Sequence, residues 1–176
     1  MAFWSDTTAS PKLTYRWVAT LGSFEHKIET YTLKSFQKPS FDITVSEYLD
    51  INDVAFKPGI LTWKPVEITL IDSEERSVNN TSILYDVIQA SGYVKTGGTR
   101  YGKPQSAIVK QEASTALGGQ IMFDQINELN ATIETWTLRN PFISQINFGA
   151  ANYGADEIMT IAMTIVYDYA DYARVL

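Results

Sequence analysis

Two segments of the chain carry the residue types of ligand-binding loops, but neither completes its motif. Gly97–Lys103 reads Gly-Gly-Thr-Arg-Tyr-Gly-Lys, which matches the first part of a phosphate-binding P-loop. A Ser or Thr that binds magnesium should follow that lysine, and Pro104 follows here. Asp50–Asp53 resembles the start of a calcium loop, but Ala55 and Leu61 occupy the positions that need glycine and glutamate. We therefore expect plain loops, with no metal or cofactor site.

The residues that could perform acid–base or nucleophilic chemistry are scattered. His26 is the only histidine, and no serine or cysteine nucleophile motif accompanies it. Glu74 and Glu75 lie in a polar run before a predicted helix, where a solvated surface is the simpler interpretation. Cysteine is absent, which excludes disulfides and thiol catalysis. We expect no catalytic residue and no enzymatic activity.

The length of the chain fits a single domain, residues 1–176, and its composition is low in charged residues. Hydrophobic residues make up 45% and charged residues 19%, below the ~25% that is usual for soluble domains. The net charge of -6 argues against general adhesion to nucleic acid. The N-terminus has no signal-peptide pattern, and the longest apolar run, Ile158–Val166, is too short to span a bilayer. We expect no membrane anchoring.

Alternation of apolar and polar residues predicts a chain of β-strands. It is clearest in 60–71, where Val66, Ile68 and Leu70 share one face and Pro65 marks the strand's beginning or an edge. Further strands are predicted at 13–21, 27–36, 41–45, 106–112, 120–127, 131–138, 142–148 and 159–169. Lys57–Gly59 is a turn signal.

One stretch has helical spacing. Ile83–Ile88 repeats apolar residues every three to four positions, Asn80 or Thr81 can cap the N-terminus, and Gly92 can end the helix. The pattern predicts a mainly β (α+β) fold, a β-sandwich or barrel with one flanking α-helix.

The connection Ser46–Gly59 is rich in apolar residues, so we expect an extended arm that buries them against another surface. Its apolar residues are Tyr48, Leu49, Ile51, Val54 and Phe56.

Three segments in order, Tyr48–Asp72, Ala131–Tyr153 and Asp156–Ala170, resemble the tail-tube protein of contractile-tailed bacteriophages. The wider family includes the tubes of phage-derived injection systems and of type VI secretion. The resemblance covers about Leu13–Tyr172 and rests on the ordered set of segments.

The resemblance implies a structural virion protein that forms hexameric rings stacked into the tube of a contractile tail. Its partners would be further copies of itself, the tail sheath, the baseplate and the tail terminator, and DNA would pass through an acidic lumen without specific binding. It would be made in the bacterial host cytoplasm and reside in the virion tail. The contacts between subunits or rings would be Tyr48, Leu49, Ile51, Val54, Phe56, Lys57 and Pro58.

Two alternatives stay open. The chain could form the tube of a phage-derived contractile injection system or type VI-like apparatus. From another class, a monomeric carbohydrate-binding β-sandwich would use its surface aromatics to stack on sugars. The arm distinguishes a tube protein from a carbohydrate-binding protein, because a lectin has no need of an apolar arm.

Overall fold

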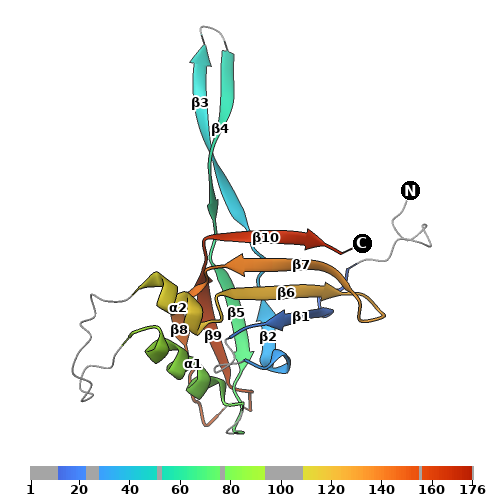
Figure 1. Cartoon of the computed structure of the whole chain (residues 1–176), viewed down its shortest axis with the longest axis vertical. Helices are drawn as coiled ribbons and strands as arrows, with labels where there is room; N and C mark the ends of the chain where they lie inside the picture. The colour runs from blue at the N-terminus through green and yellow to red at the C-terminus, as the bar shows by residue number, and fades with distance from the viewer. Residues whose placement is uncertain are drawn as a thin grey trace.

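The computed structural model describes residues 12–22, 28–50, 53–75, 78–93, 109–154 and 156–175. Two four-stranded antiparallel sheets form a sandwich, and a two-stranded arm projects from it (Figure 1). The β7 sheet has the order β1-β6-β7-β10, and the β5 sheet has the order β2-β5-β9-β8. The strands are β1 (Trp17–Thr20), β2 (Leu33–Phe36), β3 (Phe41–Asp50), β4 (Asp53–Trp63), β5 (Val66–Ile71), β6 (Gln120–Ile126), β7 (Thr132–Arg139), β8 (Phe142–Asn147), β9 (Thr160–Val166) and β10 (Tyr169–Arg174).

The strands of the β7 sheet run across those of the β5 sheet, as in orthogonally packed sandwiches (Figure 1). Neither sheet closes into a barrel within the described residues. The predicted sandwich and mainly β class are thus confirmed, and the barrel alternative is not.

The strand predicted for 60–71 is divided, because residues 60–63 belong to β4 and β5 begins at Val66, directly after Pro65. The alternation of β5 decides which of its residues enter the core. Val66, Ile68 and Leu70 are fully buried, whereas Glu67 is exposed. They pair in register with Ile165, Met163 and Ile161 of β9, which are buried as well. The main core also takes Phe123 and Leu138 from the β7 sheet. The apolar faces of the two sheets therefore bury each other.

The prediction of a single helix was wrong. Helix α1 (Asn80–Ala90) is present, with Asn79 as its N-cap in place of Asn80 or Thr81: its Oδ1 accepts a hydrogen bond of 2.8 Å from the Ser82 N–H. Gly92 adopts the expected left-handed conformation (φ 93°). A second helix, α2 (Lys110–Ala116), occupies part of the predicted strand 106–112. Its sequence, KQEASTA, contains good helix formers and lacks strand alternation.

Three other predicted elements were wrong at their ends. The strand predicted for 13–21 begins only at Trp17, because the residues before it form a turn in which the Arg16 N–H donates to the Leu13 carbonyl (3.3 Å). The strand predicted for 27–36 begins as a 3-10 helix (Thr30–Thr32) and extends only from Leu33. The strand predicted for 159–169 breaks at Asp168, and β10 continues in the other sheet. The break is fixed because the Asp168 N–H donates to the Arg139 carbonyl (3.0 Å) and its carboxylate accepts from Lys110 and Asn140.

The arm is a hairpin of β3 and β4 that begins at Phe41, five residues before the predicted start at Ser46. Lys57–Gly59 is not a turn but part of β4, where the register shifts between Ile43 and Val45. A β-bulge at this register shift explains why a glycine, Gly59, is needed in β4. A Cβ on Gly59 would lie 2.4 Å from Thr44 Oγ1, the atom that accepts a 2.8 Å hydrogen bond from the Ile60 N–H.

Candidate assembly interface

The register of the arm divides its side chains into two faces, because residues paired across antiparallel strands point to the same side. We call the first the apolar face; it is formed by Phe41, Ile43, Val45, Glu47, Leu49, Val54, Phe56, Pro58, Leu61 and Trp63. The opposite face is mainly polar and holds Asp42, Ser46, Tyr48, Ala55, Lys57 and Thr62. The arm is therefore an amphipathic ribbon with a side ready for burial.

The arm residues predicted as contacts lie on both of these faces. Leu49, Val54, Phe56 and Pro58 belong to the apolar face, but Tyr48 and Lys57 belong to the polar one. Leu49 is 75% exposed and Phe56 is 68% exposed in the single chain. The remaining predicted contact, Ile51, lies outside the described residues. The prediction missed Phe41, Ile43, Val45 and Leu61 as contacts, although the alternation of apolar and polar residues through 41–46 was the available signal.

This arrangement is unfavourable in water for an isolated chain. Two-stranded hairpins are marginally stable alone, and large contiguous apolar surfaces on soluble proteins usually mark interaction sites. Apart from Trp63, every side chain of the apolar face is exposed. The arm extends away from the sandwich, so no other part of the described chain covers its outer half (Figure 1). The apolar face is therefore a candidate surface for contact with another molecule.

The base of the arm is joined to the core by aromatic rings. Phe41 and Trp63 meet edge to face with centroids 5.2 Å apart, and Trp63 lies 6.0 Å from the ring of Tyr167. Burial raises the pKa of the Tyr167 phenol above its ordinary value. The apolar face is thus continuous with the core at one end and exposed at the other.

An ion cluster lies between the β7 sheet and the segment leading into the arm. The buried carboxylate of Glu134 in β7 binds Lys12 and, at 2.6 Å, Lys38 of the β2–β3 connection. The Tyr172 hydroxyl donates to it at 3.4 Å. Burial alone would raise the pKa of Glu134, but the two lysines outweigh it and lower that pKa. The cluster ties the arm's entry to the opposite sheet.

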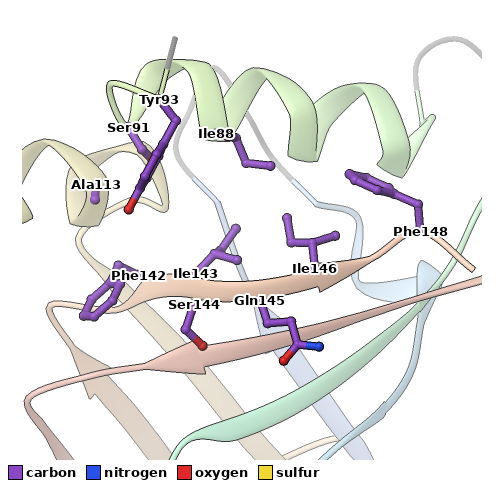
Figure 2. A pocket seen from close by; sticks show the side chains of 10 residues that line it. All are labelled: Ile88, Ser91, Tyr93, Ala113, Phe142, Ile143, Ser144, Gln145, Ile146 and Phe148. Atoms are coloured by element: carbon purple, nitrogen blue, oxygen red, sulfur yellow. The ribbon is translucent and has the colours of Figure 1, made fainter. Parts of the chain in front are cut away.

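A second apolar surface lies at the free edge of the β5 sheet, in a cleft of about 320 Å³ between β8 and the two helices. Figure 2 shows Ile143 and Ile146 of β8 directed toward Ile88 of α1, while Ser144 and Gln145 point away. None of the lining residues that the structure describes carries a charge at neutral pH. The cleft suits apolar packing and does not suit acid–base chemistry.

Among the described residues, those with possible chemistry are not brought together. The segment 97–103 and His26 lie outside the described residues, and Asp53 lies at the exposed tip of the arm. Glu74 is exposed in the connection before α1. Within the described ranges, no group of three His, Asp or Glu side chains could hold a metal ion. Among the described helices, none is long and apolar enough to cross a membrane.

No protein-family model and no curated protein sequence matches this chain. Solved structures do match its fold. A chain in the cryo-EM structure of the anti-feeding prophage cap, a tube terminating cap, superposes with a TM-score of 0.68 at 18% identity, covering 99% of this chain and 100% of that chain.

Two structures of an extracellular contractile injection system also match. A chain of the PVC sheath-tube complex gives a TM-score of 0.64 at 16% identity, with 99% of both chains covered. A chain of the PVC sheath/tube terminator gives 0.67 at 14% identity, covering 95% of this chain and 99% of that chain. At such identities the likeness shows the fold. The mainly β fold that the resemblance to tail-tube proteins implies is confirmed.

Proposed function

We propose that the chain is the subunit of the inner tube of a contractile tail or injection apparatus, a structural protein without a catalytic role. Copies assemble into hexameric rings, and the rings stack into a hollow conduit. The observation that carries the proposal is the apolar face of the arm, which is exposed in the single chain although its residues are of core type. The full-length likeness to chains of tube, cap and terminator structures supports it.

The projecting arm supports a tube of stacked rings (Figure 1). The arm supplies one side of the contact. The other side, which we call the acceptor surface, must be a different surface on the body of another copy. Such a head-to-tail interface is heterologous and propagates without closing. Each sheet has two edge strands: β1 and β10 in one sheet, β2 and β8 in the other. Among the described residues, each edge strand has one side without a neighbouring strand, so subunits within a ring can meet edge to edge.

The partners of the tube would be the tail sheath around it, the baseplate at one end and a terminator at the other. The matched structures include a sheath-tube complex, a sheath/tube terminator and a baseplate. The net charge of -6 suits a lumen that repels DNA, so that a genome slides through it without binding. In a phage, the protein would be made in the host cytoplasm and reside in the virion tail.

A second candidate is the tube of an injection particle that carries a protein toxin instead of DNA. The specific observation in its favour is that two of the matched chains belong to an extracellular contractile injection system. Capsid and terminase genes beside the coding gene would favour the phage tail, and their absence from a complete gene cluster would favour the injection particle.

The test is negative-stain electron microscopy with light scattering across a concentration series of the purified full chain. We expect six-fold rings or hollow tubes, and scattering mass that rises steeply with concentration. A chain that stays monomeric at the highest concentration and binds sugars on a glycan array would contradict the tube and support the carbohydrate-binding alternative.

A further inference from the structure

One charged residue interrupts the apolar face of the arm. Glu47 lies opposite Phe56, between the pairs Val45–Pro58 and Leu49–Val54, and every other member of this face is apolar. A carboxylate within a surface that becomes buried needs a cation to replace its lost hydration. The arm has a lysine near this position, Lys57, but its register places it on the opposite face. The cation that pairs with Glu47 must therefore come from the acceptor surface.

The body contains a cleft whose chemistry matches this requirement. It has a volume of about 440 Å³ and lies between β2 and the start of β1. Its aromatic part is the pair Trp17 and Phe36, whose rings meet edge to face with centroids 4.6 Å apart. Three lysines line it: Lys12, Lys34 and Lys38. The combination of apolar rings with ammonium groups complements an apolar strand that carries one carboxylate.

The lysines of this cleft do not all have acidic partners. Lys12 and Lys38 share the carboxylate of Glu134. Lys34 is exposed, and no ion pair forms on it among the residues that the structure describes. Three lysines line the cleft and only two of them share a carboxylate, so the cleft keeps a surplus of positive charge in a protein that is acidic as a whole.

Glu47 cannot reach the cleft of its own chain. It lies six residues beyond Phe41 along β3, which places it roughly 20 Å out from the base of the arm at about 3.3 Å per residue. The arm points away from the sandwich that contains β1 and β2 (Figure 1). A contact between this carboxylate and the cleft has to join two copies.

We propose that the apolar face of the arm docks into the cleft between β1 and β2 of another copy, where Glu47 pairs with Lys34 and Phe56 packs against Trp17 and Phe36. The inference rests on the proposed function, because it assigns the acceptor of the contact that stacks the tube. The pair also fixes the register of docking, since a shifted arm would bury Glu47 among apolar side chains.

Charge reversal tests the pairing. Glu47→Lys and Lys34→Glu are each expected to raise the concentration needed for assembly by about tenfold or more, since truncating or reversing one partner of a buried charge pair weakens binding strongly. The double variant Glu47→Lys with Lys34→Glu is expected to restore assembly. Circular dichroism checks that each variant folds. Single variants that assemble normally, or a double variant without recovery, would overturn the pairing.

Cross-linking gives a second readout, helped by the absence of cysteine from the chain. Glu47→Cys combined with Lys34→Cys is expected to give a ladder of covalent multimers on a non-reducing gel. The matched control is Lys57→Cys with Lys34→Cys, because Lys57 lies nearby on the other face of the arm. Wild-type tubes with no ladder from the Glu47–Lys34 pair would overturn this contact and leave the tube function standing. A wild type without tubes or rings, and no ladder, would overturn both.

Discussion

Strand β5 and the arm have the same sequence pattern and opposite surroundings. In β5, Val66, Ile68 and Leu70 alternate with polar residues and are fully buried against the second sheet. In β3, Ile43, Val45 and Leu49 alternate in the same way, yet they are 48%, 63% and 75% exposed. Alternation specifies a strand with one side to bury, but it does not specify what buries it. In β5 the chain itself supplies the cover, and on the arm our proposal assigns that role to another copy.

The difference in burial between β5 and the arm is tested most sharply by making the same substitution in both regions. Leu70→Ala in β5 is expected to lower the free energy of unfolding by about 2–5 kcal/mol, because it leaves a cavity in a closed core. Leu49→Ala on the arm is expected to change it by less than about 0.5 kcal/mol in the monomer. Urea denaturation below the assembly concentration measures both. Equal losses would show that the arm is already buried within one chain.

The next largest effect concerns the ion cluster that ties the arm's entry to the body. Glu134→Gln is expected to cost about 1–3 kcal/mol of folding free energy, because Lys12 and Lys38 lose their charged acceptor. The variant should also change the pH dependence. The folded pKa of Glu134 lies below its usual 4.5, so the ion pairs stabilise the fold above about pH 4.5, and this stability is lost as pH falls through the folded pKa.

Urea denaturation of both proteins between pH 7 and pH 3 measures this. The gap in unfolding free energy between wild type and Glu134→Gln should shrink as the pH falls below about 4.5. A gap that stays constant over this range would contradict a role for the charge.

A smaller and local effect is expected at the bulge of the arm. Gly59→Ala places a methyl group 2.4 Å from Thr44 Oγ1, so the strands must shift, at a cost of about 1–2 kcal/mol. Hydrogen exchange of the Ile60 amide, which donates to that oxygen, should quicken while the amides of β5 keep their protection. Thr44→Ala in the Gly59→Ala background removes the clashing oxygen and should recover part of the lost stability. Unchanged exchange throughout the arm would show that the bulge tolerates a side chain.

The smallest effect is expected at the exposed ion pair near the break between β9 and β10. Lys110→Ala removes one partner of Asp168, whose pKa is lowered by hydrogen bonds from Lys110 and Asn140. Both side chains of the pair are partly solvated, so the loss of stability should be below about 1 kcal/mol. Thermal unfolding of the variant measures it, and a loss of several kcal/mol would mean that this corner organises the sandwich.

Prediction from the sequence works best for elements whose conformation and burial are set by their own local residue pattern. The alternation of β5 and the apolar spacing of α1 set their burial directly, so both were predicted and found. Lys57–Gly59 has the composition of a turn, and only the cross-strand contact with Thr44 makes it a bulge. The break at Asp168 depends on Arg139 and Lys110, distant in sequence, and could not be read from the alternation of residues 159–169.

For the interface, composition located the arm but not its faces. Tyr48 and Phe56 are both large aromatic residues, and only the register of the hairpin assigns them to different faces. The surplus charge of Lys34 depends on which neighbours already hold the carboxylate of Glu134, a long-range fact that spacing does not encode.

The most direct test of the central claim is sedimentation velocity, with electron microscopy, of wild type and Phe56→Asp. Tyr31→Asp is the matched control, since Tyr31 is 71% exposed on the body and Phe56 is 68% exposed on the arm. We predict that wild type and Tyr31→Asp form long tubes, while Phe56→Asp stays folded and sediments as rings or smaller species. Full-length tubes from Phe56→Asp would contradict the account, because the apolar face of the arm would then not be the stacking contact.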